Sequence, residues 1–333
     1  MEDLAASILL GCIDSDVLSD EEIAFFQETQ PAGVTLFSRN INRTQQEQSL
    51  KKLTEALQGL NRRSETPFLI AIDQEGGRVA RLKHPFPNAG PALHLGKGLP
   101  QEAARKKIYQ YALEVGASLC NLGININFAP VLDIFTNPEN EAIGDRCFGS
   151  TLDEVIWKAG AFLDGLNVSN VMPCLKHFPG QGDASFDTHL HSSPIYSKIA
   201  DLRKRELKPF IELHEKSPMI MVSHCVYPLI DKKEASLSSI IMYELLRVEM
   251  GFKGLVVSDD MTMGAIKNKE THWTQLLVES VVNGVDLVLI CEGLKNWQEA
   301  RLAIEYEAKN SVVFRNRLRE ASSKVAQLRK KLA

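Results

Sequence analysis

Eight short apolar segments recur along the chain, separated by longer stretches with helical periodicity. Each segment is rich in Val, Ile, Leu and Phe, and most lack the apolar–polar alternation of a strand with one solvated face. Continuous apolar runs are typical of parallel strands that helices cover on both sides. The predicted strands span residues 7–12, 33–37, 68–73, 124–129, 171–177, 219–223, 254–258 and 286–290.

The amphipathic stretches complete eight β/α repeats. Predicted helices span residues 44–60, 101–122, 152–166, 199–214, 239–250, 274–283 and 297–307, with a last one near 312–332. This order predicts an α/β fold, a single (β/α)8 TIM barrel, with a doubly wound open sheet as the alternative. Long connections after the third, fourth and fifth strands account for much of the length beyond about 250 residues. No linker or composition break divides residues 1–333, so one domain is expected.

The composition is that of a globular protein, with 44% hydrophobic and 24% charged residues. A net charge of −4 provides no electrostatic footprint for nucleic acid or an anionic membrane, and neither partner is expected. No segment is long and apolar enough to cross a bilayer. A small-molecule substrate and a monomer are the simplest expectations.

Two further features bear on location. Leu9-Leu10-Gly11-Cys12 resembles a lipoprotein cleavage box, but Glu2 and Asp3 replace the required positive region. We therefore expect a buried strand there. The six cysteines are scattered, without a CxxC pair, which favours reduced thiols and a cytoplasmic setting.

Polar side chains stand within or just beyond the predicted strands. They are Asp73, Asn127, Lys176, His177, His224, Asp259, Asp260 and Glu292. The carboxyl ends of all barrel strands converge on one rim, which is where active sites of such barrels lie. An open sheet would instead spread these groups along a crevice. The pattern predicts an active site at the carboxyl rim.

The segment KHFPGQGDASFDTHLH, residues 176–191, is the densest group of reactive side chains. Its Pro and Gly residues predict a loop, and loops on rigid scaffolds carry much of protein chemistry. In Asp187-Thr188-His189, a carboxylate lies two residues before a histidine. Such a carboxylate can bind the imidazole, fix its tautomer and raise its basicity. This spacing indicates a catalytic acid/base pair.

Two other motifs contain carboxylates at strand ends. In GLVVSDD, adjacent carboxylates point in different directions, so we expect Asp259 to face the pocket, with Asp260 or Thr262 capping the next segment. Asp73 precedes a glycine turn with Arg81 nearby. It can hold ligand hydroxyls or form a structural ion pair, and the residues leave both roles open.

The ordered motifs IDQEGGRV, DRCFGS, KHFPGxGDxxxDTH and VVSDDMTM resemble those of bacterial β-N-acetylhexosaminidases of glycoside hydrolase family 3. More closely, the chain is similar to the single-domain cytoplasmic enzymes of peptidoglycan recycling. The resemblance implies a retaining exo-β-N-acetylglucosaminidase. Its expected substrates are peptidoglycan fragments such as GlcNAc-β-1,4-anhydroMurNAc, with or without peptide, cleaved at the non-reducing end by one catalytic barrel domain.

The resemblance also assigns roles to residues. Asp259 corresponds to the nucleophile, His189 to the acid/base and Asp187 to its orienting partner. The substrate-binding positions are Asp73, Arg81, Arg146, Lys176 and His177, with His224 at a further pocket position. No cofactor and no metal are implied. A histidine with an ordinary pKa of about 6.5 suits donation and recovery of a proton near neutral pH.

One departure from the family pattern stands at Gln181, where the motif usually reads KHFPGHGD. Glutamine keeps hydrogen-bonding capacity but cannot carry a proton, so we expect activity with altered loop order or substrate preference.

Three other readings stay open. A phosphorylase is one, because a neutral histidine tolerates an incoming phosphate better than a carboxylate would. A metal-dependent barrel hydrolase is another, although the His189-x-His191 pair lies in a loop and not at strand ends of fixed geometry. A non-catalytic sugar-binding protein is the third, suggested by Gln181.

Overall fold

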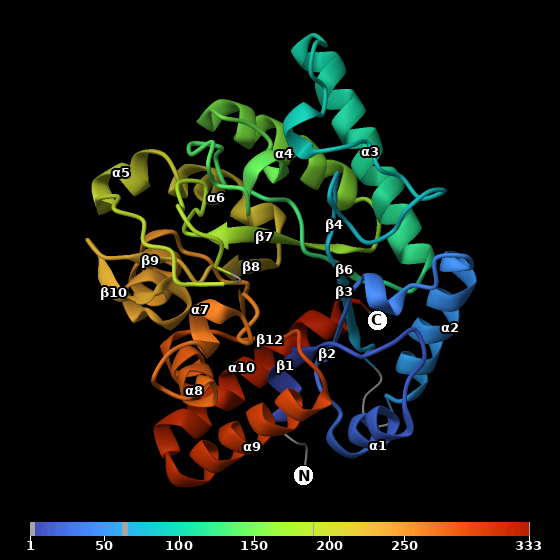
Figure 1. The fold of residues 1–333 in the computed structure, drawn as a ribbon, viewed down its shortest axis with the longest axis vertical. Coiled ribbons are helices and arrows are strands. Elements are labelled where there is room, and N and C mark those ends of the chain that lie inside the picture. The colour runs from blue at the N-terminus through green and yellow to red at the C-terminus, as the bar shows by residue number, and fades with distance from the viewer. Residues whose placement is uncertain (1–3, 62–65, 189, 333) are drawn as a thin grey trace.

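The computed structural model describes residues 4–61, 66–188 and 190–332 as a ring of helices around a central parallel sheet (Figure 1). The sheet order is β11-β8-β7-β6-β3-β2-β1-β12. A parallel bridge between Val257 and Leu287 links β11 to the segment before β12, so the sheet nearly closes on itself. The barrel prediction is confirmed, and the open-sheet alternative is wrong.

All eight predicted strands are present; seven are shorter than predicted, and β7 keeps its predicted length but is shifted by one residue. Their bounds are β1 (Leu9–Gly11), β2 (Gly33–Leu36), β3 (Leu69–Ile72), β6 (Ile126–Asn127), β7 (Met172–Phe178), β8 (Met219–Val222), β11 (Leu255–Ser258) and β12 (Val288–Ile290). Two short antiparallel hairpins were not predicted. They are β4 (Gln74–Gly76) with β5 (Val79–Ala80), after β3, and β9 (Val226–Tyr227) with β10 (Asp231–Glu234), after β8.

The helices follow the predicted order. Their bounds are α1 (Asp20–Thr29), α2 (Gln46–Gly59), α3 (Gln101–Asn121), α4 (Leu152–Leu166), α5 (Ile199–Lys204), α6 (Leu207–Leu213), a π-helix (Ile240–Glu249), α7 (Gly264–Lys267), α8 (Trp273–Asn283), α9 (Leu294–Asn310) and α10 (Val312–Lys330). Short 3₁₀ turns lie at Ala6–Ile8, Ser38–Asn40, Ala92–His94, Gly144–Arg146, His214–Lys216 and Ala235–Leu237. No helix in the described ranges is long and apolar enough to span a membrane.

Two helical predictions need correction. Helices α1 and α7 were not predicted, although Ser19 and Glu22 form a reciprocal capping box at the start of α1. The stretch 199–214 is not one helix, because the chain leaves helical geometry at Arg205, between α5 and α6. Pro209 explains this break, since its ring would clash with the carbonyl of residue 205 in a continuous helix.

Side chains fill the barrel interior in a separate apolar cluster. It contains, among others, Leu10, Leu69, Ala71, Ile126, Phe128, Cys174, Met219, Met221, Leu255, Val257, Leu287 and Leu289. Helix α10 contributes Val325 and Leu328 to the same cluster, and the Arg329 guanidinium donates to the carbonyl of Pro67, just before β3. The end of α10 therefore covers the amino ends of the strands and leaves their carboxyl ends free for a site.

A buried carboxylate anchors α10 to the barrel. Asp286 is fully buried and accepts a hydrogen bond of 2.6 Å from Arg247 in the π-helix. From α10 it accepts a hydrogen bond of 2.7 Å from Arg317 and forms an ion pair of 3.3 Å with Lys324. The same carboxylate accepts from the backbone N–H of Val256 at 3.0 Å. One side chain thus joins the π-helix, β11 and α10.

Replacing Asp286 by Ala should lower the free energy of unfolding by about 3–5 kcal/mol, because it leaves two partly buried guanidinium groups without their anion. Denaturant titration of the variant and the wild type measures this difference. Glu320→Ala is the matched control: this exposed carboxylate also contacts Arg317 and Lys324, and its loss should cost less than about 1 kcal/mol. Equal effects of the two substitutions would contradict the anchoring role.

Candidate active site

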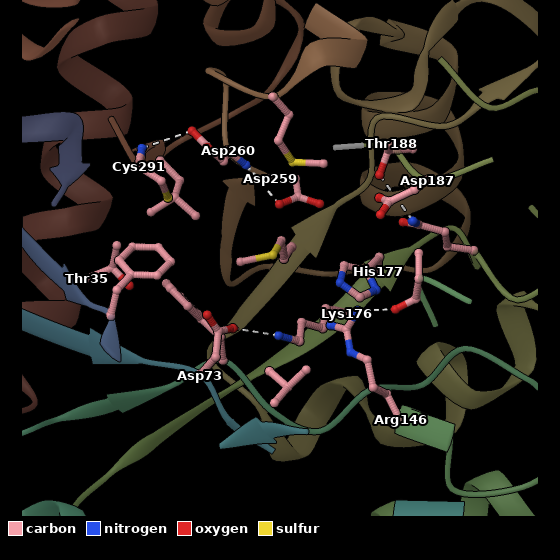
Figure 2. A pocket seen from close by; sticks show the side chains of 18 of the residues that line it. Thr35, Asp73, Arg146, Lys176, His177, Asp187, Thr188, Asp259, Asp260 and Cys291 are labelled. Atoms are coloured by element: carbon pink, nitrogen blue, oxygen red, sulfur yellow. Dashed lines mark hydrogen bonds and ion pairs between the residues drawn. The ribbon is translucent and has the colours of Figure 1, made fainter. Parts of the chain in front are cut away.

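A cavity of about 300 Å³ opens at the carboxyl ends of the strands (Figure 2). Seven predicted site residues line it: Asp73, Arg81, Arg146, Lys176, His177, Asp187 and Asp259. Its apolar base includes Phe128, Met221 and Leu289 from the barrel interior. The volume lies at the lower end of the range for small-molecule sites, which suits one compact ligand group.

Lys176, at the end of β7, is the central cation of the site. Its side chain is almost fully buried, and its ammonium nitrogen lies 2.8 Å from Asp73 Oδ1 and 2.6 Å from Glu75 Oε1. Burial alone would lower the pKa of this ammonium, but the two carboxylates outweigh it, and the pKa is raised. Lys176 therefore stays charged, and it ties β7 to the segment that follows β3.

Asp73 and Glu75 each share Lys176 with a guanidinium. Arg81 donates to Asp73 Oδ2 at 2.9 Å, and Arg146 binds Glu75 through two parallel hydrogen bonds of 2.8 Å. The ion pair considered for Asp73 is thus present, and the same side chain also lines the cavity. Glu75 was not singled out from the sequence, although it lies within IDQEGGRV. Its signal was its place two residues beyond a strand end.

The cations keep both carboxylates ionised. Burial acts to raise the pKa of Glu75, but Arg146 and Lys176 lower it from 4.5 to about 2. Burial acts in the same direction on Asp73, where Lys176 and Arg81 prevail and the pKa is lowered. Ionised groups form the stronger hydrogen bonds with neutral hydroxyls, so Asp73, which lines the cavity, is suited to bind a polyol.

His177 is held by the carboxylate of Asp133, which, like Glu75, was not singled out from the sequence. Its Nδ1 lies 2.7 Å from Oδ2 of Asp133, which is fully buried in the segment after β6. The other oxygen of Asp133 accepts from the backbone N–H of Gln181 at 2.6 Å. A carboxylate at Nδ1 fixes the ring orientation and favours the proton on that nitrogen.

Both aspartates after β11 line the cavity, but their hydrogen bonds differ. The expected capping role of Asp260 or Thr262 is wrong, because the N-cap of α7 is Met263 and no side chain caps that helix. Asp259 lines the cavity, and its Oδ1 accepts from the backbone N–H of Asp260 at 2.8 Å. The Asp260 carboxylate instead accepts from the backbone of Thr262 and of Cys291, both at 2.9 Å, and from the Thr262 hydroxyl at 2.6 Å. Burial raises the pKa of Asp260. Figure 2 shows both side chains, with the Asp260 bond to Cys291 drawn.

The predicted acid/base pair is described in part. Asp187 lines the cavity, and its backbone carbonyl accepts from the N–H groups of Leu190 and His191. His189 lies outside the described residues, so its catalytic role stays a prediction.

His224 is the predicted residue that the structure does not bring to the cavity. It is fully buried and is not among the lining residues. Its Nδ1 lies 2.6 Å from the hydroxyl of Ser236, and its Nε2 lies 3.0 Å from the carbonyl oxygen of Asp260. Both ring nitrogens are occupied by protein groups, so His224 braces the chain after Asp259 and does not face a ligand. Within the described ranges, no three His, Cys, Asp or Glu side chains converge as a metal site would require.

The lowered pKa of Glu75 predicts an acid-dependent stability. Because the folded pKa is depressed, its contribution is complete above pH 4.5 and is lost as the pH falls towards about 2. Glu75→Gln should therefore be less stable than the wild type at pH 7, on the order of 3 kcal/mol, and the two should converge near pH 2. Unfolding free energies measured across this range provide the test.

The control for this experiment is Glu139→Gln, which changes an exposed carboxylate. Its stability should follow the wild type at every pH. A constant gap between Glu75→Gln and the wild type down to pH 2 would show that the difference arises from packing and not from ionisation.

Comparison with known proteins places these features in context. The family model described as the glycosyl hydrolase family 3 N-terminal domain matches residues 10–328. A β-hexosaminidase from Idiomarina loihiensis is 34% identical over 264 residues, covering 78% of this chain and 76% of that protein.

Solved structures of known proteins are also similar to this chain. A family 3 β-N-acetylglucosaminidase from Paenibacillus superposes with a TM-score of 0.91 at 29% identity, covering 100% of this chain, which spans 62% of that longer protein. NagZ from Neisseria gonorrhoeae, solved with N-trifluoroacetyl-D-glucosamine, superposes with a TM-score of 0.80 at 27% identity. That match covers 96% of this chain and 97% of NagZ.

Proposed function

The chain belongs to glycosyl hydrolase family 3 as a β-N-acetylhexosaminidase, and we propose that it is a retaining exo-acting enzyme that removes terminal β-linked N-acetylglucosamine. The observation that carries the proposal is the cavity itself. Its volume of about 300 Å³ suits a single sugar unit, its polar wall contains Asp73, Lys176 and Arg146, and Asp259 lines the same space. A site with room for a single sugar unit favours cleavage from a chain end.

In the proposed reaction, Asp259 attacks the anomeric carbon and displaces the leaving group, forming a covalent glycosyl-enzyme. His189 donates a proton to the departing oxygen and then accepts one from the water that hydrolyses the intermediate. Asp187 orients His189. Support for Asp259 over Asp260 comes from their contacts, because the carboxylate of Asp260 is occupied by the backbone of Thr262 and Cys291.

The remaining sugar hydroxyls are proposed to bind the charged wall. Lys176, Arg81 and Arg146 are donors, and the ionised Asp73 is an acceptor, so the wall offers both kinds of partner. These side chains are held in place by one another before substrate arrives. Preorganisation of this kind reduces the entropy that binding costs.

The natural substrate is proposed to be a peptidoglycan fragment such as GlcNAc-β-1,4-anhydroMurNAc, with or without peptide. The motif resemblance and the match to NagZ support this choice. We also propose one catalytic domain over residues 1–333, a monomer, and a cytoplasmic setting. The single eight-stranded sheet supports the first, and the six free cysteines support the last.

The first test addresses Asp259. The wild type should cleave an aryl β-N-acetylglucosaminide in preference to the β-glucoside and β-xyloside. Asp259→Ala should lower kcat by at least about 10⁴-fold, because the covalent step is lost. A fluorinated glycoside that slows hydrolysis of the intermediate should label Asp259, as read by peptide mass spectrometry.

Asp260→Asn is the matched control, because asparagine keeps an oxygen that can accept from the neighbouring backbone. It should still be labelled at Asp259. Label on any other residue would overturn the assignment, and a sugar 1-phosphate formed in phosphate buffer would replace hydrolysis by phosphorolysis.

The second test addresses His189. His189→Ala should slow substrates with poor leaving groups by about 10²–10⁴-fold, and activated aryl glycosides much less, because their departure needs little protonation. A plot of rate against leaving-group pKa measures this difference. His191→Ala, a change at the exposed histidine of the same loop, should leave the slope unchanged. Equal losses across all leaving groups would argue against the acid role.

A further inference from the structure

Buried polar atoms without partners gather around the cavity. Within the described ranges, Thr35 Oγ1, Arg81 Nε and Gln181 Oε1 are buried and have no hydrogen-bond partner, and all three residues line this cavity. Buried polar groups in folded proteins are normally paired, because an unpaired one forfeits its hydration. Unpaired groups at a ligand site are therefore the positions where a ligand can complete the hydrogen bonding.

Gln181 is the most constrained of the three. The residue is only 3% exposed, its backbone N–H donates to Asp133, and its side-chain Nε2 donates to the hydroxyl of Thr188 at 3.3 Å. Asn140 holds the same turn, since its amide donates to the backbone carbonyls of Gln181 at 2.8 Å and of Gly182 at 3.1 Å. Asp133 and Asn140 fix the backbone of this turn, Thr188 accepts from the side-chain Nε2, and Oε1 is left without a hydrogen-bond partner.

We propose that Gln181 binds the substrate directly, with Oε1 accepting one hydrogen bond from a hydroxyl or the acetamido N–H of the bound sugar. The inference rests on the proposed function and adds a specificity-determining residue to it. A sugar with the matching donor completes the bonding of Oε1. A sugar without that donor buries the oxygen unpaired and is rejected.

The neutral amide has a consequence that a histidine at this position would not have. Glutamine does not titrate, so its contact with the sugar is independent of pH. The side chain of Gln181 also donates to Thr188, which is the neighbour of Asp187 in the chain. Through Asp133 and His177, Gln181 therefore links the charged wall of the cavity to the segment that contains the predicted acid/base pair.

If Gln181 had a purely structural role, its loss would affect all substrates alike. Substrate analogues therefore distinguish a structural role from direct contact with the sugar. In Gln181→Met, a side chain of similar length lacks both polar atoms. The variant and the wild type would be assayed on an aryl β-N-acetylglucosaminide and on four analogues, each lacking one donor group, at C2, C3, C4 or C6. The quantity compared is the ratio of kcat/KM between wild type and variant.

With the parent substrate, Gln181→Met should lower kcat/KM by about 10- to 100-fold. With one of the four analogues the ratio should fall close to one, because the donor that meets Oε1 is already absent. A ratio that is the same for all five substrates, or close to one for the parent, overturns the proposal. Wild-type protein inactive on every substrate would overturn the proposed function itself, which distinguishes the two failures.

Asn140→Ser is the matched control. It weakens the hydrogen bonds that hold the turn but leaves the Gln181 side chain intact, so it should lower kcat/KM by a similar factor for every substrate. If Asn140→Ser shows the same dependence on a single donor group as Gln181→Met, the effect belongs to loop order and the direct contact is excluded. Thermal unfolding of both variants reports how far each one disturbs the fold.

Discussion

The site depends on a buried ammonium group, that of Lys176. Isolated in the barrel mouth, such a charge would lose its hydration without compensation. Here it lies between Asp73 and Glu75, which in turn bind Arg81 and Arg146. The resulting cluster joins the ends of β3 and β7 to the loop before α4. The stability of the rim and the geometry of the charged wall of the cavity therefore arise from the same ion pairs.

The fold was largely predictable because its strongest signal is local. Each strand is a continuous apolar run, and the run itself marks burial on both faces. Most predicted strands were too long because apolar residues extend beyond the hydrogen-bonded ladder, as at β6, which is only Ile126–Asn127. Helix α1 was missed despite the capping box at Ser19 and Glu22, and the break near Arg205 follows from a single proline, Pro209.

The sequence allowed the location of the site to be predicted better than the contacts between its side chains. Barrel geometry brings strand ends together, which located Asp73, Lys176 and Asp259 correctly at the cavity. Pairs such as Asp133 with His177, 44 residues apart, leave no periodic trace in the sequence. His224 shows the same limit from the other side, since the strand-end rule places its backbone but does not determine where its ring points.

The position of helix α10 at the amino end of the barrel determines how ligands reach the cavity at the carboxyl end. In the described part of the chain, Val325 and Leu328 cover the amino end and apolar side chains fill the interior beneath the cavity, so ligands enter and leave through the carboxyl end of the barrel. In the double-displacement reaction proposed above, the aglycone would leave, and water would enter, by this same route. The monosaccharide formed in that proposed reaction would leave last and would compete with incoming substrate for the same cavity.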